Sequence, residues 1–116
     1  MDNVKQRIIQ ESVPGKQLTL AHIIANPDPS LYASLQTKGI AIQSAIGILT
    51  ITPPETAIII ADIAIKSAGV TAVSVDRVSG SLIVTGTVSE VEAAINAILN
   101  YVGTKLNFEV CELTKT

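Results

Sequence analysis

Residues 53–68 form the longest apolar stretch of the chain and predict a helix with isoleucine or alanine on almost every face. Thr52 as a cap, Pro53 at the first helical position and Glu55 as the capping-box partner predict its start. A helix on the surface of a monomer normally has one apolar stripe and one polar face. A chain of 116 residues has too little mass to bury this helix on a second side. We therefore expect neighbouring copies of the chain to cover that side.

The rest of the pattern predicts strands, separated by turn residues, and a second long helix. The predicted strands are 8–13, 17–25, 45–51, 70–78, 82–88 and 106–113, the fourth and fifth forming a hairpin around 79–81. A short helix is expected from Asp28 to about Gln36. The apolar stripe of the second long helix consists of Val91, Ala94, Ile95, Ile98, Leu99 and Val102.

Capping signals mark the ends of the two long helices. Ser89 and Glu92 have capping-box spacing and predict the start of the second one. Gly69 follows the last apolar position of the first helix and is expected to end it in a left-handed conformation. Gly103 is expected to end the second helix.

From Ala45 onward the predicted order is strand, helix, strand, strand, helix, strand. This order predicts an α+β, ferredoxin-like fold of the split βαβ type, in which two helices cover one face of an antiparallel sheet. The segment 16–38 adds a strand and a helix before this core. The length allows one domain, which we place at 16–116, preceded by a tail at 1–15.

Composition favours a subunit of a larger assembly. The chain is 47% hydrophobic but only 16% charged, whereas an ordinary soluble domain is about 25% charged. An aromatic content of 3% argues against base-stacking nucleic-acid modules. A net charge of -2 without a basic cluster argues against binding to a phosphate backbone. We expect no nucleic-acid partner.

The side chains that carry chemistry are sparse. Cys111 is the only cysteine and His22 the only histidine, so one chain can build neither a disulfide nor a structural zinc site. We expect no cofactor and no metal.

The N-terminus lacks a signal-peptide core. The helix at 53–68 is shorter than the ~20 apolar residues of a membrane span and contains Asp62 and Lys66, so we expect a cytosolic protein with no membrane partner.

Three stretches resemble a known family: RIIQESVPGKQLTLAHIIANP (7–27), SAIGILTITPPETAIIIADIAIKSAGV (44–70) and VDRVSGSLIVTGTVSEVEAAI (75–95). They are similar to bacterial microcompartment shell proteins with a single BMC domain. Within that family they resemble the circularly permuted subgroup of ethanolamine- and propanediol-utilisation compartments. An unpermuted BMC domain begins at the equivalent of Ala45 and carries its last strand and helix at the C-terminus. In this chain that strand and helix are expected at 16–38.

The resemblance implies a non-catalytic structural protein. Its homohexamers would tile with other BMC-domain shell proteins around encapsulated enzymes in the bacterial cytoplasm. Lys66 would lie at the hexamer edge and contact the next hexamer. A hairpin would lie toward the central pore, formed by Asp76, Arg77, Val78, Ser79, Gly80 and Ser81. Each subunit would also give one strand to a small barrel that caps the pore, formed by Arg7, Ile8, Ile9, Gln10, Glu11, Ser12 and Val13.

The chain departs from the family at two places. Ser12 stands where members of the subgroup carry an aromatic residue, so either the barrel packing would be weaker or its lumen more polar. The C-terminal CELTKT lacks the Pro-Arg-Pro edge motif of unpermuted members, so no edge arginine can be assigned.

The candidate residues also allow simpler interpretations. His22 can be a hydrogen-bonded structural histidine, and Cys111 a buried inert thiol. Asp62 and Lys66 can form only an intrahelical contact, and 79–81 can be only a tight turn. A Ser-His-Asp triad would need His22 to meet Asp62 and a serine, and no serine lies in a nucleophile elbow. The alternative to a shell protein is a small-ligand binding or regulatory ferredoxin-like oligomeric module.

Overall fold

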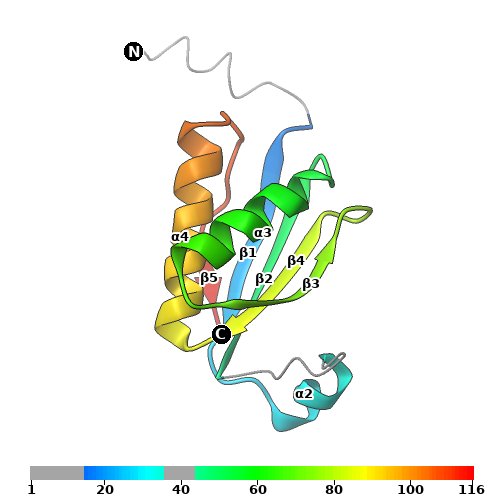
Figure 1. The fold of residues 1–116 in the computed structure, drawn as a ribbon, viewed down its shortest axis with the longest axis vertical. Helices are drawn as coiled ribbons and strands as arrows, with labels where there is room; N and C mark the ends of the chain where they lie inside the picture. Colours follow the sequence, from blue (N-terminus) through cyan, green and yellow to red (C-terminus); the bar gives the residue numbers. More distant parts are fainter. Residues whose placement is uncertain (1–14, 36–43) are drawn as a thin grey trace.

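The computed structural model describes residues 15–35 and 44–116, which form one five-stranded sheet covered on one face by helices (Figure 1). The strands are β1 (Gln17–Ile24), β2 (Ala45–Thr52), β3 (Thr71–Asp76), β4 (Ser81–Gly86) and β5 (Thr114–Lys115). The helices are α2 (Pro29–Leu35), α3 (Thr56–Ser67) and α4 (Val88–Thr104). The predicted α+β class is therefore confirmed, with the two long helices on the same face of the sheet.

The strand order is β3-β4-β2-β1-β5, and only the pairing of β1 with β5 is parallel. The predicted hairpin is confirmed as β3 and β4. Strand β1 precedes Ala45 in sequence but lies between β2 and β5, and it pairs with β2 along its whole length. Strand β1 is thus an integral part of the sheet.

Helices α3 and α4 pack side by side across the sheet, α3 mainly on β3 and α4 mainly on β2. The predicted stripe of α4 is confirmed, since its members are fully buried except for Leu99, which is partly buried against the core. Apolar side chains from both layers meet between the helices and the sheet, among them Ile23, Leu49, Ile60, Leu82, Ile95 and Ile98.

Helix α3 starts later than predicted. Its first residue is Thr56, its N-cap is Glu55, and no side chain caps it, so the prediction of a Thr52 cap with Pro53 in the first turn is wrong. A residue that precedes proline is disfavoured in the helical region, and Pro53 precedes Pro54. The chain enters the helix through a turn in which the Thr56 N–H donates to the Pro53 carbonyl at 3.0 Å.

The start of α4 is also displaced. Thr87, not Ser89, caps this helix: its side chain accepts from the Glu90 N–H at 3.2 Å, and the Glu90 carboxylate accepts from the Thr87 N–H at 2.9 Å. The two overlapping Ser/Thr-x-x-Glu spacings both fit the capping-box pattern. The end of β4 at Gly86, two residues before the predicted end of the strand, selects the first of them.

Both predicted helix ends differ from the observed ones. Gly69 does not have positive φ, and a Cβ there would lie 2.8 Å from Glu90 Oε2, the end of a flexible side chain that can move aside. Gly103 lies inside α4, which continues to Thr104, and the left-handed residue is Asn107 with φ of 60°.

The last predicted strand is largely wrong. Between 106 and 113 only Glu109 forms a bridge, to Gln17, and β5 begins at Thr114. The Glu109 carbonyl accepts from the Leu18 N–H at 2.8 Å, and the Thr116 N–H donates to the Ile23 carbonyl at 2.8 Å. This segment is therefore held beside β1 near its two ends. The short helix predicted after Asp28 is confirmed as α2, and the Asp28 carboxylate accepts from the Ser30 N–H at 2.9 Å.

The hairpin between β3 and β4 is bonded to the end of β2, just before the turn that leads into α3. Gly80 has φ of +82°, its N–H donates to the Asp76 carbonyl at 2.8 Å, and its carbonyl accepts from the Ile51 N–H at 2.9 Å. A Cβ at Gly80 would collide with the Ile51 carbonyl oxygen and crowd Pro54 Cα. Only glycine satisfies both the positive φ and this close approach.

Replacing Thr87 by alanine is expected to lower the free energy of unfolding by about 1 kcal/mol, because it removes the cap of α4. Ser89→Ala is the matched control and should change it by no more than about 0.5 kcal/mol. Urea unfolding at one fixed protein concentration measures both. A larger loss from Ser89→Ala would contradict the observed cap.

Gly80→Ala tests the attachment of the hairpin. Gly15→Ala is its control, because Gly15 has a similar φ of +83° but a Cβ there would have no other atom within 4 Å. Left-handed backbone costs a non-glycine residue roughly 1–2 kcal/mol at either position. The collision at Gly80 should add at least about 1 kcal/mol to the loss of unfolding free energy. Equal losses in urea unfolding would show that the hairpin can move away from Ile51.

Candidate assembly surfaces

One chain covers only part of α3. Its buried face contains Ala57, Ile60, Ala61 and Ala64. On the outer face Ile58, Ile59 and Ile65 remain 53%, 47% and 51% exposed. The chain by itself thus leaves the second apolar side of this helix open, as its length implied. That neighbouring copies cover this side stays a prediction.

Lys66 lies in the last turn of α3 and projects from the outer face. Its Nζ lies 2.9 Å from Asp62 Oδ2, and the two side chains are 74% and 59% exposed. The hydrogen bond and the charge of Asp62 raise the pKa of the Lys66 ammonium. The predicted intrahelical contact is confirmed. The exposed position leaves Lys66 free to contact a neighbouring molecule as well.

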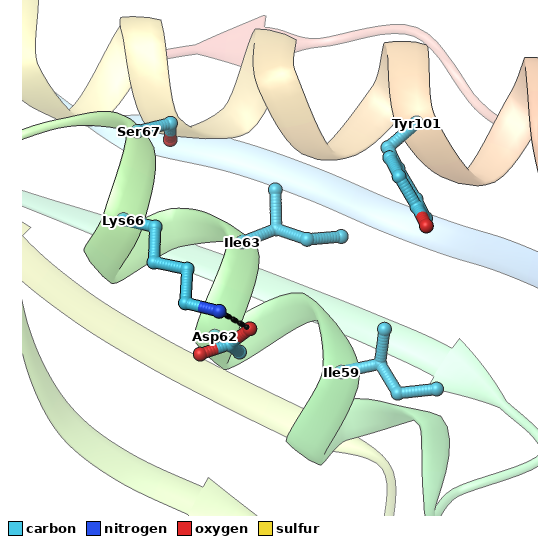
Figure 2. Close-up of a pocket in the computed structure, with 6 residues that line it drawn as sticks. All are labelled: Ile59, Asp62, Ile63, Lys66, Ser67 and Tyr101. Carbon is cyan, nitrogen blue, oxygen red and sulfur yellow. Dashed lines mark ion pairs between the residues drawn. The ribbon is translucent and has the colours of Figure 1, made fainter.

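A shallow groove runs between α3 and α4 beside this ion pair (Figure 2). Its volume is about 420 Å³, and its lining consists of Ile59, Asp62, Ile63, Lys66, Ser67 and Tyr101. Tyr101 comes from α4, points toward α3 and is 43% exposed. The sequence reasoning missed Tyr101. Its position could have indicated a contact surface, because an aromatic residue three positions after Ile98 lies next to the apolar stripe of α4.

The β3–β4 hairpin presents a rigid backbone and one exposed apolar side chain. Asp76 Oδ1 accepts from the N–H groups of Val78 and Ser79 at 2.9 and 3.2 Å. These bonds hold the pKa of the Asp76 carboxyl below its usual range. The Ser79 hydroxyl donates a hydrogen bond to the Ser81 hydroxyl oxygen at 3.0 Å. Val78 is 80% exposed at the tip.

The hairpin and Lys66 lie at opposite ends of α3. Gly80 is bonded to Ile51, just before the turn that leads into the helix, whereas Lys66 lies in its last turn. The twelve residues of α3 correspond to a length of about 18 Å at 1.5 Å per residue. The structure therefore does not bring these two predicted sites together, and they suit two different contacts.

His22 has a structural role, as the simpler interpretation predicts. Its Nδ1 and Nε2 lie 2.6 and 2.9 Å from the hydroxyl oxygens of Thr114 and Thr116. The imidazole thus ties the C-terminal strand to β1. Asp62, the acid that a triad would need, is paired with Lys66 instead.

Cys111 is half-buried, and this burial raises the pKa of its thiol.

Within residues 15–35 and 44–116, no cluster of three histidine, cysteine or acidic side chains could hold a metal. No helix in these same ranges is long and apolar enough to cross a membrane. The predicted barrel strand at 7–13 lies outside the described residues.

Residues 45–113 match the family of the BMC domain. The bacterial microcompartment shell protein EutS of Salmonella typhimurium is 50% identical over 112 residues, which cover 97% of this chain and 98% of EutS. The shell protein PduU of the same bacterium is 48% identical over 110 residues, which cover 95% of this chain and 93% of PduU.

Solved structures show the same similarity. A flat hexamer of CutR matches with a TM-score of 0.83 and 45% identity, covering 91% of this chain and 95% of the CutR chain. A screw form of CutR with a 41.9 Å pitch matches with a TM-score of 0.82 and 44% identity, covering 89% and 100%. Since sequence and fold agree over nearly the whole length, the chain belongs to the BMC-domain family of bacterial microcompartment shell proteins.

Proposed function

We propose that this protein is a structural component of a bacterial microcompartment shell. It forms cyclic homohexamers that tile, with other BMC-domain shell proteins, into the facets around encapsulated enzymes in the cytoplasm. The similarity to the CutR flat hexamer carries the proposal, because it combines 45% identity with a TM-score of 0.83. The relatives EutS and PduU are both named shell proteins, so a small-ligand or regulatory module is not favoured.

The exposed side of α3 gives this assembly its physical basis. Burying apolar surface contributes about 25 cal/mol per Å², and Ile58, Ile59 and Ile65 are each about half exposed in one chain. A ring closes when one surface of a subunit meets a different surface of the next one. The assembly is non-catalytic, and its function follows from its geometry.

Lys66 is the edge residue of the hexamer in this proposal. It is exposed on the outer face of α3, at the end opposite to the β3–β4 hairpin. If the hairpin lies toward the six-fold axis, the direction of α3 carries Lys66 away from it and toward the rim. The long aliphatic part of lysine can pack on a neighbour while its ammonium stays hydrated.

The β3–β4 hairpin, residues 76–81, lines the pore. Its attachment to Ile51 and the bonds to Asp76 make it a fixed rather than a mobile element. Six copies around an axis would surround it with the hydroxyls of Ser79 and Ser81, with Arg77 and Val78 at the tips.

The domain is circularly permuted and spans 16–116. The family match begins at residue 45, whereas β1 lies before it and supplies a strand between β2 and β5. A strand that precedes the matched region and yet is interior to the sheet supports a permuted order of the same fold. Residues 1–15 form a tail, in which 7–13 provide one strand per subunit to a barrel over the pore.

The Lys66→Ala variant separates ring formation from tiling. We expect the natural protein to form six-fold rings and sheets in negative-stain electron microscopy. Lys66→Ala should keep the hexamer mass in light scattering but raise the concentration needed for sheets at least about tenfold, because it removes the edge contact. Lys115→Ala removes the same charge at the opposite edge of the sheet and should leave tiling unchanged.

Two results would contradict these assignments. A natural protein that is monomeric at micromolar concentration in physiological salt would refute the shell function. Loss of the hexamer itself in Lys66→Ala would show that Lys66 closes the ring and does not join rings.

Deleting residues 1–14, with a new initiating methionine, tests the barrel. We expect an intact hexamer whose axis is open in averaged electron micrographs, because the deletion removes the proposed cap and leaves β1 in place. Dissociation of the ring would show instead that the tail is needed for assembly.

A further inference from the structure

The segment that follows α4 returns to the start of β1 and holds it there (Figure 1). Glu109 lies beside Gln17 in a parallel bridge. The Glu109 N–H donates to the Lys16 carbonyl at 3.0 Å, and the Glu109 carbonyl accepts from the Leu18 N–H at 2.8 Å. One residue of the C-terminal segment thus uses both of its backbone hydrogen-bonding groups to hold the chain on either side of Gln17.

The side chain of Phe108 adds a contact next to these bonds. The Lys16 ammonium lies 5.6 Å from the centre of the Phe108 ring, within the range in which a cation is attracted to an aromatic face. The ring also packs against the hydrophobic core, and the Phe108 N–H donates to the Val102 carbonyl in α4 at 2.9 Å. The contact therefore joins Lys16 to a fixed part of the fold.

Gly15 comes directly before this contact and lies in open space. Its φ is +83°, and a Cβ there would have no other atom of the described residues within 4 Å. Open surroundings put no restraint on the direction of the chain at this residue. Within residues 15–35 and 44–116, the bonds and the ring contact at Lys16 are therefore what fixes the chain nearest to the N-terminal tail.

We propose that residues 107–109 form a clamp at the base of the N-terminal tail, and that this clamp sets the direction in which residues 1–14 leave the sheet. The inference rests on the proposed function, which places residues 7–13 in a barrel over the pore. It deepens that function by assigning the positioning of the barrel to the C-terminal segment of the same chain.

Symmetry and entropy give the clamp its purpose. Six tails meet on one axis when each leaves its subunit in the same direction, because the subunits of a cyclic ring are equivalent. A tail whose base is already fixed also loses less conformational entropy when it joins the other five. Lys16 and Phe108 are positioning residues in this proposal, since they act on the barrel through the base of the tail.

Hydrogen exchange of the intact hexamer, followed by mass spectrometry at residue resolution, measures the clamp itself. Lys16→Gln removes the cation, whereas Phe108→Leu removes the aromatic face and keeps an apolar side chain against the core. We expect the N–H groups of Leu18 and Glu109 to exchange about two to five times faster in either variant. Lys16→Arg keeps the cation and should exchange like the natural protein. The Ile51 N–H, bonded to the β3–β4 hairpin, is the internal control and should not change.

Electron cryomicroscopy of the same hexamers measures the effect on the tail. The natural protein and Lys16→Arg are expected to show density over the six-fold axis. In Lys16→Gln and Phe108→Leu this density should weaken relative to that of the sheet, while light scattering gives an unchanged hexamer mass. The double variant Lys16→Gln/Phe108→Leu should behave like either single variant, because both substitutions remove the same contact.

Three results would overturn the inference and leave the shell function in place. The first is unchanged exchange at Leu18 in both single variants. The second is axial density as strong as in the natural protein although exchange at Leu18 is faster. The third is a natural hexamer without axial density, which would refute the barrel as well. Absence of rings in the natural protein would refute the proposed function itself, and with it this inference.

Discussion

Helix α3 carries more apolar surface than one chain can cover, and the other features of the molecule are arranged around it. Alanines and Ile60 bury its inner face against the sheet, while three isoleucines stay about half exposed. An exposed apolar face of this kind favours aggregation in water, and burial by further copies of the chain removes that tendency. The β3–β4 hairpin is fixed at one end of this helix and Lys66 lies at the other. The helix thus sets the distance between a proposed pore and a proposed rim.

The sheet joins β1 to the strands that follow Ala45. Strand β1 pairs with β2 on one side and with β5 on the other, and the imidazole of His22 holds the last residues against it. Removing β1 would expose the edge of β2 and the apolar side chains of the core. The family match begins only at residue 45, yet the fold depends on the strand that precedes it.

The apolar pattern predicted the α+β class, the hairpin and the burial of α4, because these follow from the periodicity of the side chains. The ends of elements depend on neighbours that a local pattern does not contain. Two capping-box patterns overlap in the sequence. Because β4 ends at Gly86, Thr87 becomes the N-cap of α4. Gly69 follows the end of α3, but its backbone does not adopt the left-handed conformation that the local pattern predicted. Tyr101 was missed because the groove that it lines also needs α3, which lies more than thirty positions earlier in the chain.

A high-resolution structure of the assembled protein, from electron cryomicroscopy of rings or sheets, tests the central claim most directly. The quantity to measure is the exposed fraction of Ile58, Ile59 and Ile65, which is 53%, 47% and 51% in the single chain. The account predicts that neighbouring copies bury these side chains within the ring or between rings. Rings in which all three remain as exposed as in the single chain would contradict it.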